Sequence, residues 1–414
     1  MSRFPLTARG TGAAVLAFTA FVAAHAFQIT ELLYISALLT VAVAGSVATL
    51  YLVRRTERVE RFFDPDVGTV GRDLDVHLRV EIRSPLPTAQ GRWRDRLPDG
   101  VTGVPEGVFP QTRSGMRTGQ RGVDLHYSVT PQRRGIRNIG PISVSSTDPF
   151  GFARRRHAIG RPLPLTVTPA VLTLAPLADQ AGDVGGTMHA TTDQIGQGSD
   201  NLVPRHYAPG DSMRRIHWRA SAHRDQLMVR QEEQESTPTA IVVLDRASGR
   251  WNVEATRAPG GDRGFETAVC ACVSIAARLV QEGYLVRVVD FDGAALSDPI
   301  DGGDAAGVER LAIDLAPITA RRDGMPETLA AVLSGETVGP LVVIGGVLTP
   351  PDAAALAPLA HHSSLPVLLA VTPTPGALAE AAASGWRVGR IATEDELEGA
   401  WADAVQRGAH RVFS

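Results

Sequence analysis

The sequence predicts a protein of three parts: two N-terminal transmembrane helices, then a small β-sandwich, then an α/β domain with a mainly parallel sheet. Three patterns along the 414 residues support this fold class. Two long apolar runs come first, alternating apolar and polar residues follow, and short apolar runs then alternate with helical patterns. In that order, these patterns are typical of membrane spans, of strands with one buried face, and of parallel strands covered by helices.

The apolar runs within residues 11–53 predict a transmembrane hairpin. Residues 11–27 and 32–53 approach or reach the roughly 20 residues that a spanning helix needs, and residues 28–31 form a short polar break. Arginines flank both outer ends of the pair: Arg3, Arg9, Arg54, Arg55, Arg58 and Arg61. The positive-inside rule then places residues 1–10 and the chain after the second span in the cytoplasm. We therefore expect a plasma-membrane protein with two spans and a mainly cytoplasmic chain.

A cleaved signal peptide is the alternative interpretation of the first run. Ala24, His25 and Ala26 have the small-x-small form of a cleavage site after an apolar stretch that arginines precede. A second span that starts so soon afterwards favours the hairpin. In either case Arg54 and Arg55 would hold the rest of the chain in the cytoplasm.

Residues 54–172 predict the β-sandwich. Between residues 74 and 82, and again between 123 and 129, apolar and polar residues alternate with the period of two of a half-buried strand. Shorter versions occur at 142–144 and 163–167, separated by glycine, proline and asparagine. Several short strands without helical periods between them suggest a small sandwich. We expect Phe150, in the turn at residues 148–151, to plug one end of it.

Residues 239–414 predict the α/β domain. We expect strands at residues 239–244, 285–291, 341–344, 366–371 and 388–392, and helices at residues 266–282, 305–315, 326–333 and 394–407. Near-continuous apolar strands that alternate with helices indicate a parallel sheet covered on both faces. The only two cysteines, Cys270 and Cys272, point in different directions on one helix, so we expect small core residues there. Residues 173–201, which show no period, are expected to form a linker.

Residues 202–238 carry the most specific pattern in the chain, because a Pro-Gly-Asp turn is combined there with six arginines and three histidines. The net charge is only −3, so no global basic field would recruit nucleic acid, and anion binding must come from a local cluster. The candidate binding residues in this motif are Arg205, Tyr207, Gly210, Asp211, Arg214, Arg215, His217, Trp218, Arg219, Arg224, Arg230 and Glu232.

The local structure expected for this motif is a capped helix followed by a short strand. Asp211 or Ser212 can cap a helix that begins at Met213, and residues 227–229 form the strand. Arg214 and Trp218 are four residues apart, close enough for a guanidinium to stack on the indole. Two interpretations remain open. The arginines form an internal ion-pair network that clamps the motif onto the α/β domain, or they recognise an acidic surface, a phosphate or an anionic headgroup.

The chain resembles the domain-of-unknown-function 58 family through an ordered set of motifs. After the paired spans these are Pro131-Gln132-Arg133-Arg134-Gly135, Gly140-Pro141, Asp148-Pro149-Phe150-Gly151, Arg205-x-Tyr207-x-Pro209-Gly210-Asp211 and Ile216-His217-Trp218. The resemblance implies a von Willebrand factor A-like fold from Thr239 onward. It also implies association with a MoxR-type AAA+ ATPase, and so an adaptor or chaperone partner rather than an enzyme.

The same resemblance raises the question of a metal cofactor. A von Willebrand factor A domain binds a divalent ion with a D-x-S-x-S loop, whose hydroxyl and carboxylate oxygens are hard ligands. Here Asp245 is kept and Ser248 is nearby, but Ala247 and Gly249 stand where the two serines should be, and Arg246 adds a repelling charge. Residues 342–346 also lack the second carboxylate. We therefore expect no metal, Mg²⁺ included, and Asp245 mainly as a loop-capping residue.

The sequence favours a non-enzymatic protein. It contains no nucleophile elbow, no Walker-type glycine loop and no His/Glu zinc spacing, and no small-molecule substrate suggests itself. The preferred hypothesis is a membrane-anchored, cytoplasm-facing adaptor or scaffold that works with a MoxR-type AAA+ ATPase or another envelope protein in complex assembly. The alternatives are an anion or anionic-lipid binding module that uses the arginine cluster, and an enzyme of unknown class.

Overall fold

The computed structural model describes residues 5–51, 56–83, 90–111, 121–148, 150–177, 202–206, 213, 216, 218–224, 226–232, 238–321, 326–333 and 338–406. The chain forms two compact units. Unit 1 comprises residues 1–170, 257–261 and 312–319, and unit 2 comprises residues 171–256, 262–311 and 320–414. The predicted fold class is confirmed, since two apolar N-terminal helices and β-sheets lie in unit 1 and a parallel sheet lies in unit 2.

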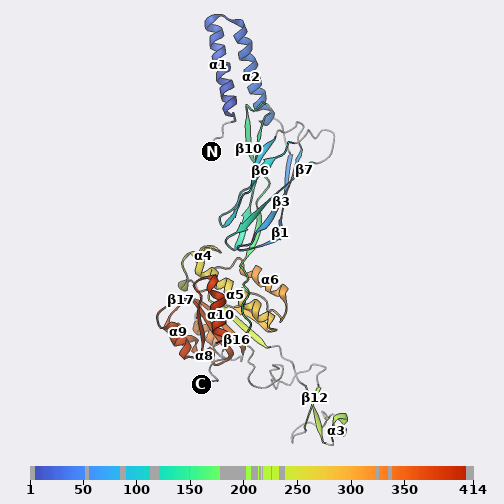
Figure 1. Cartoon of the computed structure of the whole chain (residues 1–414), viewed down its shortest axis with the longest axis vertical. Coiled ribbons are helices and arrows are strands. Elements are labelled where there is room, and N and C mark those ends of the chain that lie inside the picture. Colours follow the sequence, from blue (N-terminus) through green and yellow to red (C-terminus); the bar gives the residue numbers. More distant parts are fainter. Residues whose placement is uncertain are drawn as a thin grey trace. The chain divides into compact units, whose positions relative to one another are not determined.

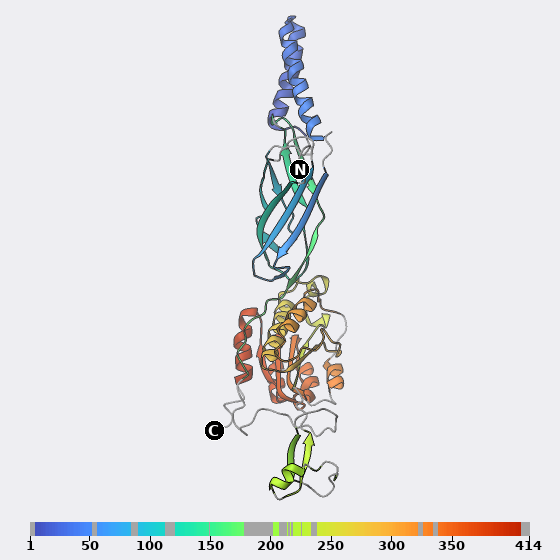
Figure 2. The same ribbon diagram turned by 90° about the vertical axis from the view of Figure 1, so that its right-hand side faces the viewer.

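Unit 1 begins with two helices, α1 (Ala8–Phe27) and α2 (Thr30–Tyr51), which lie side by side as a hairpin (Figures 1 and 2). With 20 and 22 residues, both are long and apolar enough to span a membrane. Gln28 ends α1 in a left-handed conformation (φ 55°), and only Ile29 separates it from α2. The connection is therefore shorter than the polar break in the sequence suggested, because Thr30 and Glu31 already belong to α2.

The rest of unit 1 is built from three β-sheets. Their strand orders are β1-β3-β7-β5, β10-β9-β4-β6 and β2-β11-β8. The strands are β1 (Thr56–Asp64), β2 (Val67–Thr69), β3 (Leu74–Arg83), β4 (Gly91–Arg94), β5 (Val101–Gly103), β6 (Glu106–Phe109), β7 (Arg121–Pro131), β8 (Gly135–Ile139), β9 (Ile142–Thr147), β10 (Arg154–Ile159) and β11 (Leu163–Thr168). The predicted alternation is confirmed in β3, where Leu78 is buried between exposed or half-buried polar neighbours. Leu78, Val144 and Leu165, one from each sheet, belong to a single hydrophobic core.

A buried ion pair crosses this β-domain. Arg61 Nη2 donates to both carboxylate oxygens of Asp95, at 2.9 and 2.7 Å, and the two side chains are 3% and 0% exposed. The Tyr127 hydroxyl donates to the same carboxylate at 2.7 Å, and burial together with the Asp95 charge raises the pKa of Tyr127. Gly140 lies against this pair at φ 102°, and a Cβ there would be 2.6 Å from Arg61 Nη1. Glycine in the Gly140-Pro141 motif therefore makes room for the guanidinium.

The Pro-Gln-Arg-Arg-Gly motif also has a structural explanation within unit 1. The Arg134 side chain is fully buried, and its Nη1 donates to the carbonyl oxygens of Leu315 and Ala316 at 2.7 and 3.0 Å. Both acceptors belong to the 312–319 segment of the same unit. Arg137 Nη2 donates to the Arg134 carbonyl at 2.7 Å. Both arginines of this region therefore donate hydrogen bonds to backbone carbonyl oxygens within unit 1.

The turn at residues 148–151 differs from the prediction. Phe150 does not plug the sandwich, because 66% of it is exposed. The reason is the neighbouring Asp148, whose carboxylate accepts hydrogen bonds from the backbone N–H groups of Phe150 and Ala153 at 2.9 and 2.6 Å. Asp148 itself is only 3% exposed, so the turn is held from inside by a carboxylate and displays its aromatic side chain outward.

Unit 2 is built around a five-stranded sheet with the order β15-β14-β16-β17-β18, in which every neighbouring pair is parallel. The strands are β14 (Thr239–Leu244), β15 (Leu285–Val289), β16 (Val338–Leu348), β17 (Ser363–Pro373) and β18 (Arg387–Arg390). The predicted strands at 341–344 and 366–371 are the centres of β16 and β17. In chain order the sheet runs 2-1-3-4-5, so its connections reverse direction between β14 and β16.

Helices follow the strands of this sheet. They are α4 (Glu254–Arg257), α5 (Arg263–Gln281), α6 (Ala305–Leu315), α7 (Pro326–Leu333), α8 (Pro350–Ala360), α9 (Ala377–Ala383) and α10 (Leu397–Gln406), with short 3₁₀ turns at Ser248–Arg250 and Glu394–Glu396. Helix α5 also has the length and composition of a membrane span, but 78% of that stretch is buried inside the fold. It is therefore the core helix that the sequence predicted at 266–282.

Candidate functional site

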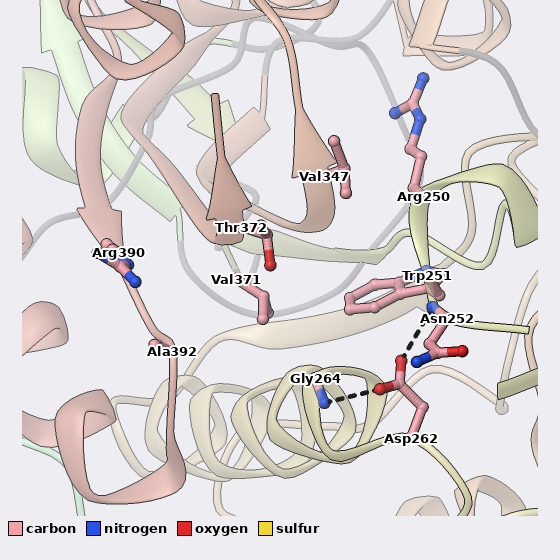
Figure 3. A pocket seen from close by; sticks show the side chains of 10 residues that line it. All are labelled: Arg250, Trp251, Asn252, Asp262, Gly264, Val347, Val371, Thr372, Arg390 and Ala392. Atoms are coloured by element: carbon pink, nitrogen blue, oxygen red, sulfur yellow. Dashed lines mark hydrogen bonds between the residues drawn. The ribbon is translucent and has the colours of Figure 1, made fainter. Parts of the chain in front are cut away.

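The candidate site of unit 2 is a pocket of about 460 Å³ at the carboxyl edge of the parallel sheet (Figure 3). Ligands of open α/β sheets bind outside the carboxyl ends of the strands, where the strand order reverses, and that point lies between β14 and β16 here. The pocket is lined by Arg250, Trp251, Asn252, Asp262, Gly264, Val347, Val371, Thr372, Arg390 and Ala392.

Asp245, directly after β14, organises the first wall of this edge. It is fully buried, and its Oδ1 accepts a hydrogen bond from the backbone N–H of Ala247 at 2.9 Å. The Trp251 indole N–H donates to the carbonyl oxygen of Asp245 at 3.0 Å. Burial raises the pKa of the Asp245 carboxyl to about 6, and the Arg250 guanidinium and backbone hydrogen bonds limit that rise. Asp245 therefore shapes the loop rather than pointing a free carboxylate at solvent.

Arg250 is the cation that faces Asp245, and sequence reasoning missed it. Its Nη1 lies 3.5 Å from Asp245 Oδ2, and its Nη2 donates to Asp352 Oδ1 at 2.9 Å. Asp352 in turn accepts from the Thr349 N–H and hydroxyl at 3.0 and 2.6 Å in the capping box of α8. Arg250 also stands over the Phe291 ring, 5.2 Å from its centroid. One guanidinium thus joins the loop after β14 to the helix after β16.

Arg246, the residue predicted to oppose a metal, faces a different carboxylate. Its Nη1 is 3.9 Å from Asp290 Oδ2, and Arg321 Nη2 approaches the same oxygen at 2.6 Å and also pairs with Asp292. Ser248 donates its backbone N–H to the Arg321 carbonyl at 2.6 Å. Each carboxylate named here is thus matched by an arginine. Among the described residues, no three His, Cys, Asp or Glu side chains are grouped as a metal site requires.

The opposite wall of the pocket is the start of α5. Asp262 caps this helix by accepting from the Gly264 and Phe265 N–H groups at 3.3 and 3.4 Å, and it also accepts from the Asn252 N–H at 3.4 Å (Figure 3). Arg390, at the end of β18, is exposed and pairs with no carboxylate among the residues that the structure describes. The pocket therefore has one exposed guanidinium, that of Arg390, across from the capped terminus of α5, whereas the Arg250 guanidinium points away from the pocket toward Asp245 and Asp352 (Figure 3).

Cys270 and Cys272 lie in the interior of α5 and are not available for chemistry. They are 1% and 0% exposed, and burial raises the pKa of each thiol to about 12. At neutral pH roughly one thiol in 10⁵ would be ionised even without the steric barrier. We expect neither thiol to react when the native protein is treated with a maleimide at pH 7, as counted by mass spectrometry. Urea-unfolded protein should react at both positions, and rapid labelling of the native chain would contradict this expectation.

The arginine-rich motif forms a small β-hairpin and helix. Strand β12 (Leu202–His206) pairs antiparallel with β13 (Met228–Glu232), and α3 (Trp218–Arg224) lies between them in the chain. Of the predicted site residues, those on β12, α3 and β13 are Arg205, Trp218, Arg219, Arg224, Arg230 and Glu232. The other predicted site residues lie outside the described residues, and so do both predicted helix caps, Asp211 and Ser212. These other site residues are Tyr207, Gly210, Asp211, Arg214, Arg215 and His217.

The helix in this motif begins later than predicted. Ile216 forms an antiparallel β-bridge with Val229 and is 5% exposed, so the chain is extended there and cannot be in the middle of a helix from Met213. Helix α3 starts at Trp218, whose side chain is 67% exposed. A contact with Val229, thirteen residues further along the chain, therefore overrides the local helical pattern.

Two comparisons with known proteins match part of the chain. A protein-family model described as "Protein of unknown function DUF58" matches residues 204–367. A curated relative, "Uncharacterized protein YeaD" of Bacillus subtilis (strain 168), is 22% identical over 194 residues, which are 47% of this chain and 49% of the relative. The match thus spans about half the length of each protein.

Solved structures give weaker matches. A von Willebrand factor type A protein from Catenulispora acidiphila is 13% identical, with a TM-score of 0.29 over 41% of this chain and 42% of that chain. The CARDB domain of a Pyrococcus furiosus protein, solved in complex with di-metal ions, is 11% identical, with a TM-score of 0.19 over 28% of this chain and 93% of that chain. Of these comparisons the family model is the specific one, and its match runs from β12 of the arginine-rich motif into β17 of the parallel sheet.

Proposed function

We propose that this protein is a membrane-anchored, cytoplasm-facing adaptor that binds an acidic segment of a partner protein in the carboxyl-edge pocket of unit 2. The partner that the family resemblance suggests is a MoxR-type AAA+ ATPase, with other envelope proteins as the wider class. The observation that carries the proposal is an exposed arginine, Arg390, in a pocket at the carboxyl edge of a parallel sheet.

The chemistry of this pocket suits carboxylates. Guanidinium groups bind carboxylates through two parallel hydrogen bonds, and such charge-assisted bonds are stronger than neutral ones. Arg390 is exposed, whereas the Arg250 side chain is 15% exposed and already oriented by Asp245 and Asp352. A partner carboxylate would therefore meet the exposed Arg390 guanidinium, with the Trp251 ring in the same pocket.

The donor set at this edge does not fit a resident divalent cation, and we infer that the adaptor works without one. A hard cation needs several oxygen ligands around one position. The oxygen Asp245 Oδ2 faces the Arg250 guanidinium, and Ala247 and Gly249 offer no hydroxyl in this loop. The positive charge that a metal would supply to an acidic partner is supplied by Arg390 instead.

We also infer that the protein acts by binding and not by catalysis. The carboxylates of Asp245, Asp290 and Asp352 are engaged in loop caps and ion pairs, and both thiols are buried. An arginine can bind an anionic group, but it stays protonated at neutral pH and so does not act as a general base. The pocket is therefore suited to binding.

Arg390→Glu should weaken partner binding about tenfold or more, because a charge-assisted hydrogen bond is worth about 1.5–3 kcal/mol and the new carboxylate repels acidic groups. The measurement is biolayer interferometry between the full-length protein in nanodiscs and the purified MoxR-type ATPase of the same organism. Arg92→Glu, a reversal of an exposed arginine on β4 of unit 1, is the matched control and should leave binding unchanged. Equal affinities of wild type and Arg390→Glu would remove the pocket from the interface, and absence of wild-type binding would exclude this partner.

A further inference from the structure

We propose that residues 148–156, together with the base of the helical hairpin, form a membrane-contact surface in which Phe150 inserts into the lipid interface and arginines bind anionic phospholipid headgroups. This inference concerns unit 1 and is separate from the arginine-rich motif at 202–238. It rests on the membrane-anchored part of the proposed function, because the hairpin must span the bilayer for its base to lie at the interface.

The turn at 148–151 is joined directly to the start of α1. The Thr7 N–H donates to the Phe152 carbonyl at 2.9 Å, and the Thr7 hydroxyl donates to the Gly151 carbonyl at 2.6 Å. The Arg154 N–H donates to the Pro5 carbonyl at 2.7 Å. A Cβ on Gly10 would lie 1.9 Å from the Phe152 carbonyl oxygen, so only glycine allows the helix to approach so closely. These contacts fix the turn beside the first residues of the hairpin.

The end of α2 holds the same segment from the other side. The Tyr51 hydroxyl donates to the Arg154 carbonyl at 3.3 Å, and Arg155 Nη1 donates to the Leu50 carbonyl at 2.7 Å. The Arg155 guanidinium also stands over the Tyr51 ring, 5.5 Å from its centroid. Both helices of the hairpin are therefore bonded at their bases to the start of β10.

The length of the helices sets the depth of this surface. Helix α1 has 20 residues, which at 1.5 Å per residue span about 30 Å, the thickness of a bilayer's hydrocarbon core. The whole helix is needed to cross that core, so Thr7 and Tyr51 lie at the boundary with the headgroups. Tyrosine and tryptophan are enriched at that boundary in membrane proteins, and the position of Tyr51 agrees with this preference. The turn bonded to Thr7 therefore lies at the level of the lipid interface.

The turn displays apolar surface at this level. Phe150 is 66% exposed, and its ring stacks on that of Phe152 with centroids 6.1 Å apart. As described above, the buried Asp148 carboxylate fixes the backbone that presents it, and Gly151 follows in a left-handed conformation (φ 74°). An aromatic pair held outward next to a membrane anchor gains hydrophobic free energy when it enters the interface.

Exposed arginines occur on the two elements next to this turn, α1 and β10. Arg9, Arg154 and Arg156 all have exposed side chains. Two carboxylates of the region are engaged elsewhere, Asp148 with the backbone and Glu57 with His157, whose Nε2 is 2.8 Å from Glu57 Oε2. Basic side chains next to the bilayer attract anionic lipids, and long arginine side chains reach headgroups from the edge of the apolar region. The chemistry therefore selects an anionic phospholipid surface as the occupant.

The test uses a dye at position 150 of the full-length protein in nanodiscs. Phe150→Cys is labelled with an environment-sensitive maleimide, and the buried Cys270 and Cys272 stay silent. Phe62→Cys is the matched control, since Phe62 is an exposed aromatic (53%) six residues along β1 from Thr56, roughly 20 Å further from the hairpin. Phe18→Cys, 70% exposed in α1, reports on the anchor itself.

We expect the emission at position 150 to shift to the blue and to be quenched by lipids carrying a nitroxide near the headgroup, whereas position 62 remains aqueous. Quenching at 150 should be stronger in bilayers with phosphatidylglycerol than in pure phosphatidylcholine, and Arg154→Gln with Arg156→Gln should abolish that difference. Aqueous emission at 150 with a lipid-buried position 18 would overturn this inference alone, whereas an aqueous position 18 would overturn the membrane anchor. Equal quenching in both lipids would overturn the headgroup selectivity.

Discussion

Asp95→Asn is expected to lower the free energy of unfolding of the β-sandwich by about 3–5 kcal/mol, because removal of one partner of a buried ion pair leaves the other charge uncompensated. Arg61 and Asp95 are 3% and 0% exposed and share two hydrogen bonds, at 2.9 and 2.7 Å. The amide keeps the size of the carboxylate but carries no charge to balance the guanidinium. Since whole domains are stable by only about 5–15 kcal/mol, this single change should bring the sandwich close to unfolding.

Urea unfolding of the full-length protein followed by tryptophan fluorescence measures this effect. Trp93 is a local probe, because its ring lies 5.7 Å from that of Tyr127, which hydrogen-bonds to Asp95. Glu106→Gln is the control, since it removes the partner of Arg94 in a pair whose side chains are 47% and 59% exposed. Exposed pairs contribute about 0–1 kcal/mol. A loss at Asp95→Asn no larger than that of the control would contradict the buried-pair interpretation.

The second large effect is a pH dependence that Asp245 imposes on unit 2. Burial raises its pKa from 3.8 to about 6, so the folded state binds this proton more tightly than the unfolded state. The corresponding stability is present below pH 3.8 and is lost as pH rises through 6. A difference of about 2 pKa units corresponds to about 3 kcal/mol. We therefore expect the stability of the wild type, relative to Asp245→Asn, to fall by about 2.4 kcal/mol between pH 4 and pH 7.

Urea unfolding of both proteins across this pH range gives the comparison. Trp251 reports on the site, because its indole N–H is bonded to the Asp245 carbonyl. Asp245→Asn removes the pH dependence, whereas Arg250→Met should increase it. The Arg250 guanidinium lowers the pKa of Asp245, so its removal should raise that pKa further. The loss of stability should then occur at higher pH and be larger. If the free energies of unfolding of wild type and Asp245→Asn change with pH in the same way, the Asp245 carboxyl has the same pKa in the folded and unfolded states. That result would contradict the prediction.

The sequence predicted those parts of the fold in which local pattern and tertiary environment agree. Alternation between residues 74 and 82 specified a strand with one buried face, and the apolar runs of 239–244 and 266–282 specified a central strand and its core helix. Helices α8 and α9 escaped prediction because they are rich in alanine and α8 is apolar around most of its surface, so neither shows a periodic polar face.

The site was harder to predict, because its contacts join residues far apart in the chain. Arg250 meets Asp352 across 102 positions, and neither residue is unusual in its own segment. Phe150 was misplaced for a related reason, since hydrophobicity indicates that a side chain prefers an apolar environment but does not say whether that is a core or a lipid bilayer. The N–H bonds to Asp148 that turn it outward are a property of the folded turn.

The short connection between α1 and α2 bears on how the protein is made. A hairpin returns the chain to the side from which it entered, so its insertion requires no folded domain to be exported. Gln28 and Ile29, with Glu31 in the first turn of α2, are the part that must be carried across. That load is small compared with the hydrophobic gain of two helices. In the proposed cytoplasm-facing topology, the β-domain and the α/β domain, which both follow the hairpin, can therefore fold where they are synthesised while the helices insert as one step.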